Sequence, residues 1–155
     1  MHFGRAACYA VAMPSPTALA DRLEIDDQIT RYCHAIDTGD WDALDAIFTD
    51  DATIDYTSSG GQRGGYAHMK AWLAWVLPRF AVRQHFVTNR EITIGGDTAT
   101  SRASLYNPMG TRRPDGGLDF FYTGATYHDR WRRTADGWRI VERVLEEHWR
   151  DTRGR

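Results

Sequence analysis

The strongest constraint on the fold of this chain is the separation of two hydrophobic patterns along it. Between residues 17 and 78, apolar residues recur mostly at the three- and four-residue spacings of helices. Between residues 82 and 149, four segments show the alternation and β-branched content of strands. Helices and strands segregated in this way are typical of α+β proteins, in which helices pack on one face of an antiparallel sheet.

The first half of the chain predicts three helices and one strand. Residues 17–37 form the first helix, which Gly39 ends, and residues 41–48 form a short second helix that Asp40 can cap. A strand follows near residues 52–56, and the third helix runs from residue 66 to Pro78. The apolar face of the first helix carries Ile25, Ile29, Tyr32, Cys33 and Ile36.

The second half predicts a meander of four antiparallel strands. Short turns, GGD and TADG, join the first strand to the second and the third to the fourth, and a polar loop over 109–117 joins the middle two. The expected strands are 82–94, 98–107, 118–133 and 138–149.

The composition argues against several classes of protein. The formal net charge of −2 provides no general attraction for nucleic acid, and no apolar run approaches the roughly 20 residues that span a bilayer. Cys8 and Cys33 cannot make a disulfide framework, and no histidine or cysteine pair has the spacing of a metal site. We therefore expect a cytoplasmic protein with no metal, no other cofactor, and no nucleic-acid or membrane partner.

The chain has 155 residues, which suggests one domain with a single core. The short apolar patch near the N-terminus has a weak basic lead and no clear cleavage site, so no signal peptide is predicted. We expect residues 1–16 to be a disordered extension, 17–150 to be one domain and 151–155 to be a tail.

Residues 19–149 resemble the nuclear transport factor 2-like superfamily, in its SnoaL-like branch. The segments that carry the resemblance are ITRYCHAIDTGDWDALDAIFTDDATIDY, RQHFVTN, GGDTAT and TYHDRWRRTADGWRIVER. The DWD motif with the downstream IDY and QHF is similar to scytalone dehydratase, and the Asp and His positions are similar to those of a hexachlorocyclohexane dehydrochlorinase. The resemblance implies a cone-shaped α+β barrel, in which a curved antiparallel sheet wraps around N-terminal helices and encloses a pocket.

The resemblance also implies a catalytic pair, Asp37 and His85, with Tyr56 and Tyr32 as donors to a substrate oxygen. The chain departs from scytalone dehydratase at two places. It carries YNPM, residues 106–109, where that enzyme has a second pocket histidine, and Thr126 and His128 where that enzyme has Ser and Asn. Scytalone itself is therefore not the expected substrate.

The residues themselves leave the role of this pair open. Asp37 lies at the edge of the apolar face of the first helix, near its C-terminus, where a carboxylate opposes the helix dipole. It could be solvated, cap the following turn, or contact a histidine. His85 falls in the predicted strand 82–94, on the face opposite Phe86, and Val87 indicates that this face is partly covered. His85 could then be a structural residue or part of a pocket lining.

Three functions fit this pattern. The first is a cofactor-independent lyase or isomerase, in which His85 removes a proton from a small hydrophobic substrate and Asp37 orients the imidazole. The second is a non-catalytic module that binds a hydrophobic ligand, and the third is a cyclase or epoxide hydrolase. The distance between Asp37 and His85 distinguishes the first two functions, because contact between these side chains in a pocket favours the enzyme and a wide separation favours the binding module. The expected substrate-binding residues are Trp72, Trp75, Phe86, Leu105, Phe121, Thr126 and His128.

We also expect a homodimer or a higher homo-oligomer. Curved sheets of this kind leave an outer face exposed, and Trp131, Trp138 and Val141 are predicted to lie near it.

Overall fold

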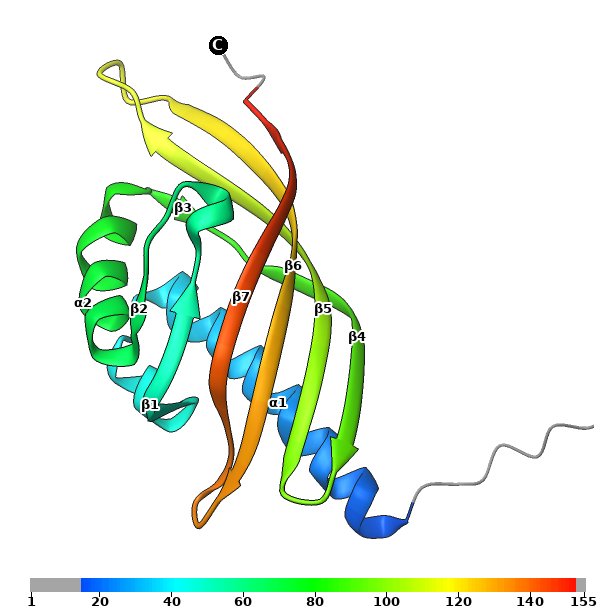
Figure 1. The fold of residues 1–155 in the computed structure, drawn as a ribbon. Helices are drawn as coiled ribbons and strands as arrows, with labels where there is room; N and C mark the ends of the chain where they lie inside the picture. Colours follow the sequence, from blue (N-terminus) through cyan, green and yellow to red (C-terminus); the bar gives the residue numbers. More distant parts are fainter. Residues whose placement is uncertain (1–14, 153–155) are drawn as a thin grey trace, which may run out of the picture.

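A computed structural model describes residues 15–152, in which seven strands form one curved sheet packed against helices (Figure 1). The predicted extension 1–16 and tail 151–155 fall mostly outside these residues. The strands are β1 (Phe48–Asp55), β2 (Arg63–Gly65), β3 (Val82–Arg83), β4 (Phe86–Gly95), β5 (Thr98–Arg112), β6 (Leu118–Thr134) and β7 (Gly137–Asp151). The α-helices are α1 (Pro16–Thr38) and α2 (Tyr66–Val76), and the 3-10 helices are η1 (Asp42–Ala46), η2 (Thr57–Ser59) and η3 (Leu77–Arg79).

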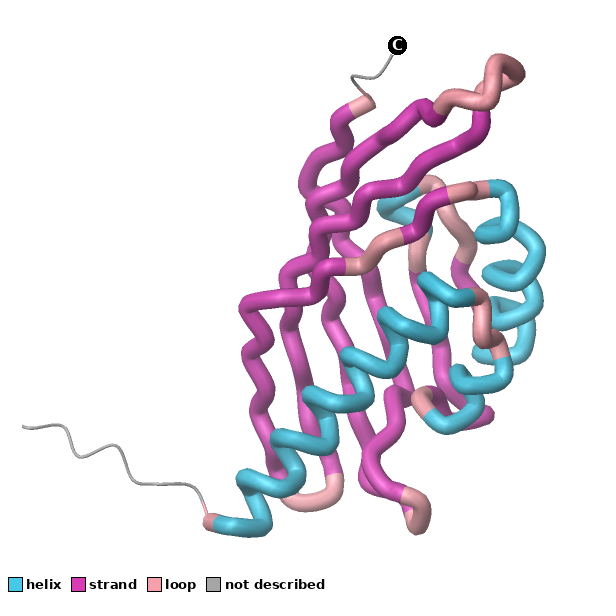
Figure 2. The backbone as a smooth tube through the Cα atoms, turned by 180° about the vertical axis from the view of Figure 1, so that it is seen from behind, coloured by secondary structure: helices cyan, strands magenta, loops and turns pink. Residues whose placement is uncertain are grey.

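The strand order in the sheet is β2-β1-β7-β6-β5-β3, and β4 also pairs with β5. The helix α1 lies across the inner face of the sheet, while α2 lies beside β1 and β2 (Figure 2). The predicted α+β class and the antiparallel meander are confirmed. The sheet is mixed rather than purely antiparallel, because β1 runs parallel to β7.

The ends of α1 follow from local chemistry. The Ser15 side chain accepts a hydrogen bond from the amide of Ala18, and Pro16 occupies the first turn, where its missing N–H removes no helical bond. Gly39 ends the helix with φ of 80°, a conformation that glycine adopts without steric penalty. Gly39 therefore fixes the point at which the chain leaves α1, immediately after Asp37.

The core lies between α1 and the inner face of the sheet. Trp131 and Trp138, which we expected near the exposed outer face, are 1% and 0% exposed. Both belong to the inner set of alternating side chains, where Trp138 Nε1 donates to Asp21 of α1 and Trp131 Nε1 donates to Ser101 of β5. These tryptophans therefore offer no surface for self-association.

The predicted strand 82–94 is interrupted at His85, the candidate base. His85 lies in the break between β3 and β4, not inside a strand. Further along, three steps on β4 face two on β5 between Thr88 and Glu91, and Asn89 has φ of 50°. This bulge reverses the alternation of side chains, so Phe86 and Ile92 lie on opposite faces although their spacing predicted the same one.

The chain after residue 107 also differs from the expected loop. The strand β5 continues to Arg112 and pairs with β6 over its whole length. This extension brings Met109 into the sheet, beside Asn107 at the end of the predicted strand.

Within residues 15–152, none of the helices has the length and apolar character that crossing a bilayer would require.

Candidate active site

The site is organised around two contacts between Asp37 and His85. Asp37 Oδ1 lies 2.6 Å from His85 Nδ1, and Asp37 Oδ2 accepts a hydrogen bond of 3.0 Å from the His85 backbone amide. A carboxylate can only accept, so the neutral imidazole carries its proton on Nδ1 and leaves Nε2 with a free lone pair. The His85 side chain is 7% exposed and lines a cavity, and because Nδ1 is taken up by Asp37, Nε2 is the ring nitrogen left available there.

Arg83 secures the end of α1 on which Asp37 lies. Its Nε and Nη2 both donate to the Asp37 carbonyl, and its Nη1 donates to the Leu77 carbonyl. A guanidinium at a helix C-terminus compensates the partial negative charge there. It offsets the unfavourable position of the Asp37 carboxylate.

Two tyrosines form a second polar element of the site. The hydroxyl groups of Tyr32 and Tyr56 lie 2.7 Å apart, and the Tyr32 ring meets the His85 ring edge-on with centroids 6.3 Å apart. Burial raises the pKa of both phenols well above its ordinary value. Both therefore remain protonated near neutral pH and can act as hydrogen-bond donors rather than as bases.

A buried ion pair lies behind these tyrosines. Arg143 and Asp129 are 0% and 3% exposed, and two hydrogen bonds of 2.7 and 2.8 Å join them. The Arg143 guanidinium also lies 4.0 Å from the centroid of the Tyr32 ring and 4.3 Å from that of Tyr127. A cation at this distance attracts the ring faces and holds the tyrosines in place.

The cavity that these groups share has a volume of about 230 Å³. Its walls come from α1, the turn after β1, α2 with η3, and the inner face of β5, β6 and β7. Most of its surface is apolar, which suits a small hydrophobic molecule. Within residues 15–152, no three His, Cys, Asp or Glu side chains are grouped in a way that could hold a metal ion.

The structure brings together most of the residues that we expected at the site. Asp37 contacts His85, although Asp37 itself is not part of the cavity surface. The predicted residues that line the cavity are Tyr32, Tyr56, Trp72, His85, Leu105 and Phe121.

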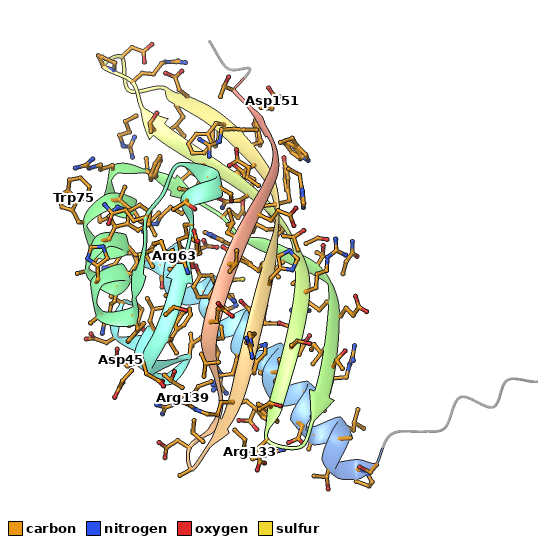
Figure 3. The ribbon with its side chains drawn as sticks, in the orientation of Figure 1. Asp45, Arg63, Trp75, Arg133, Arg139 and Asp151 are labelled. Carbon is orange, nitrogen blue, oxygen red and sulfur yellow. The ribbon has the colours of Figure 1, made fainter. Side chains whose placement is uncertain are left out.

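Four predicted substrate-binding residues lie elsewhere and require correction. Trp75 is 61% exposed on the outer side of α2, where it points away from the sheet (Figure 3). Phe86 is 45% exposed on the outer face of the sheet. Thr126 Oγ1 contacts His148 Nε2, and His128 Nε2 contacts Glu146, both without reaching the cavity.

Each correction has a geometric reason. Residues of one strand alternate between the two faces of a sheet, so Phe121 and Thr126, five positions apart, cannot line the same cavity. Trp75 lies about 60° further round the helix than Trp72, beyond the face that packs inward. The bulge at Asn89 explains why Phe86 lies on the outer face although Ile92 lies on the inner one.

Several residues of the site were not predicted: Arg83, Asp129, Tyr127, Arg143 and Arg150. A signal for two of them was present, because Tyr127 and Asp129 share the strand parity of Trp131. An acidic residue on an inner face indicates a buried carboxylate, which requires a positively charged partner, as Asp129 has in Arg143.

A family model for the SnoaL-like domain matches residues 17–144. An uncharacterized protein of Mycobacterium tuberculosis is 42% identical over 136 residues, which cover 86% of this chain and 89% of that protein. A protein of known structure from Kribbella flavida is 27% identical, with a TM-score of 0.79, over 86% of this chain and 95% of its own.

A hexachlorocyclohexane dehydrochlorinase of known structure has the same fold. It is 20% identical to this chain with a TM-score of 0.75, and the match covers 86% of this chain and 89% of the dehydrochlorinase. At this level of identity the likeness concerns the fold alone.

Proposed function

The chain belongs to the SnoaL-like family of nuclear transport factor 2-like proteins, and on that premise we propose that it is a lyase- or isomerase-type enzyme that removes a proton from carbon. The single observation that supports this function best is the Asp37–His85 contact at the wall of an apolar cavity. A module that only binds a hydrophobic ligand would not require a histidine that a carboxylate orients.

His85 Nε2 would accept the proton from a carbon next to a carbonyl or a leaving group. Asp37 would keep the ring in the tautomer with Nδ1 protonated and stabilise the imidazolium that forms. An orienting carboxylate of this kind need not itself become protonated.

The Tyr32–Tyr56 pair would supply the complementary acid. One phenol donates to the other, so the terminal hydroxyl retains a proton that it can direct at a substrate oxygen. In an elimination, the electrons of the C–H bond form the new double bond while the leaving hydroxide takes that proton, or a halide departs as an anion. In an isomerisation, His85 returns the proton to a different carbon.

The substrate would be a small, mostly apolar molecule with one oxygen or halogen at the reacting end. The dehydrochlorinase that shares this fold acts, by its name, on a chlorinated ring. The chlorine-free alternative, loss of water from a hydroxy ketone, uses the same base and makes better use of the tyrosine donors.

Deuterium exchange can test this function without the natural substrate. One- and two-ring ketones, each with and without a β-hydroxyl group, are incubated with the protein in D₂O and followed by NMR. The wild type should accelerate deuterium uptake next to the carbonyl, or loss of water, for at least one ketone. His85→Gln should abolish the acceleration, whereas His34→Gln, on the exposed side of α1, should retain it. Equal rates for His85→Gln and the wild type would rule the proposal out.

A further inference from the structure

The wall of the cavity contains a charged group that the proton transfer does not use, the guanidinium of Arg150. Among the lining residues within 15–152, Arg150 is the one that carries a permanent charge, and His85 is the one other that can titrate near neutral pH. The Arg150 side chain is 37% exposed, so it lies at the solvent-accessible edge of a largely apolar wall, where a cation favours a ligand that carries a negative charge.

A β-bulge turns Arg150 toward the cavity. Ala125 pairs with Glu147 and Gly124 pairs with Trp149, so His148 is an extra residue in β7. Strict alternation from the buried Leu145 would have placed Arg150 on the outer face. The bulge instead places Trp149 outside against Gly124, where a Cβ would collide with the indole, and returns Arg150 to the inner face.

Arg150 is held in place but keeps donors available. Its Nη2 donates to the Ser59 carbonyl at 2.8 Å and to the Glu147 carboxylate at 2.5 Å. Within the described part of the chain, the N–H groups on Nε and Nη1 have no partner. These groups can make charge-assisted hydrogen bonds to a second acid while Glu147 and Ser59 fix the side chain.

Arg150 and His85 lie at opposite ends of a polar row in the wall of the cavity. Arg150 pairs with Thr123 across β6, and Thr123 pairs with Asn107 across β5. Asn107 Nδ2 donates to the Gln84 carbonyl, next to His85, so its Oδ1 is left to accept from a ligand hydroxyl. Adjacent strands lie about 4.8 Å apart, so the row from Arg150 to Asn107 is about 10 Å long.

We propose that Arg150 anchors an acidic oxygen group, such as a carboxylate, at the end of the substrate remote from the reacting carbon. The substrate class is then a small amphipathic acid with an apolar middle, rather than a purely hydrophobic molecule. This inference rests on the proposed function for the identity of the reacting end, but its test measures binding and needs no turnover.

The experiment compares 2-naphthoate with its neutral isostere 2-naphthamide by isothermal titration calorimetry at pH 7.5. The wild type should bind the acid about ten-fold more tightly than the amide, the effect of roughly one charge-assisted hydrogen bond. Arg150→Gln should remove this preference by weakening only the acid, and Arg150→Lys should keep part of it. Arg130→Gln, which removes an exposed arginine of β6 outside the cavity, should leave the preference unchanged.

Three results would overturn the anchor. The acid and the amide could bind the wild type equally, neither could bind, or Arg150→Gln could weaken both ligands by the same factor. The last result would assign Arg150 the merely structural role of tying β7 to the turn at Ser59. None of these results affects the deuterium-exchange test of His85, so the two proposals fail separately.

Discussion

The Asp37 carboxylate holds His85 at two points, the ring nitrogen Nδ1 at 2.6 Å and the backbone amide at 3.0 Å. The second contact matters because His85 lies in a break between two strands, where no sheet ladder fixes its backbone. One side chain therefore sets both the position of the residue and the tautomer of its ring. Arg83 in turn donates to the Asp37 carbonyl at the end of α1, so hydrogen bonds hold both Asp37 and His85 in place.

Replacing Asp37 with Asn should reduce turnover about 10²- to 10⁴-fold, the range expected when a general base is misdirected. The amide can donate to Nδ1, which favours the tautomer with the proton on Nε2. Steady-state rates and circular dichroism of the variant measure activity and fold separately. Asp26→Asn is the control, since Asp26 lies on α1 and pairs with Arg90 away from the cavity. Undiminished turnover in Asp37→Asn would contradict the assigned role.

Tyr56→Phe, which removes the hydroxyl group, should lower kcat about 10- to 10³-fold, because a hydrogen-bond donor to the developing charge is lost. Tyr32→Phe should have a related effect, and the double variant should be much less impaired than the product of the two single effects, since the hydroxyls form one hydrogen-bonded unit. Tyr66→Phe removes a hydroxyl that donates to Asp45 outside the cavity lined by His85 and should leave kcat unchanged. Multiplicative losses from Tyr32 and Tyr56 would argue against a shared donor.

Arg143→Met should destabilise the fold by about 3–5 kcal/mol, because it leaves the buried Asp129 carboxylate without its partner. The matched control is Arg130→Met, one residue further along β6 from Asp129. Arg130 makes an exposed ion pair with Glu142, and its loss should change the stability by about 0–1 kcal/mol. Urea unfolding of both variants measures the difference. Similar values for the two would show that burial does not set the strength of the Asp129–Arg143 pair.

Asp21 should make the stability depend on acid pH. Hydrogen bonds from Arg133 and from Trp138 lower the pKa of Asp21 to about 2, from an ordinary value of 3.8. Since the folded state favours the ionised form, this stabilisation is complete above about pH 4 and disappears as the pH falls through about 2.

Asp21→Asn should therefore be less stable than the wild type at pH 7, and the gap should narrow between pH 4 and pH 2. Denaturant unfolding at pH 7, 4, 3 and 2 provides the comparison. Asp136→Asn, at an exposed turn position, should show no such convergence. A gap that stays constant over this range would mean that Asp21 does not titrate as described.

Much of the fold could be predicted because its signals are local. The apolar face of α1 and the glycine that ends it are readable from a few adjacent residues, and so are the turns between the long strands. The Asp37–His85 pairing is different, since 48 residues separate its members and no local rule brings them together. It was expected from the resemblance of the motifs, not from periodicity.

Several differences between the predicted and the observed site come from bulges, which reverse the side-chain alternation between the residues before and after them. A bulge at Asn89 moved Phe86 outward, and one near His148 moved Arg150 inward. A third, near Trp131, hid the main buried ion pair. Counting back from the turn after Thr134 puts Asp129 opposite Glu142, whereas the shifted register puts it opposite Arg143. A single sequence contains no clear mark of these extra residues.

The tautomer of His85 can be measured by ¹⁵N-resolved NMR of the imidazole at a pH where the ring is neutral, and the His85→Gln variant assigns the signal. We predict that the wild type carries the proton on Nδ1 and leaves Nε2 free to accept, and that Asp37→Asn reverses this preference. A proton on Nε2 in the wild type would mean that the nitrogen facing the cavity cannot act as the base, and the proposed mechanism would be wrong.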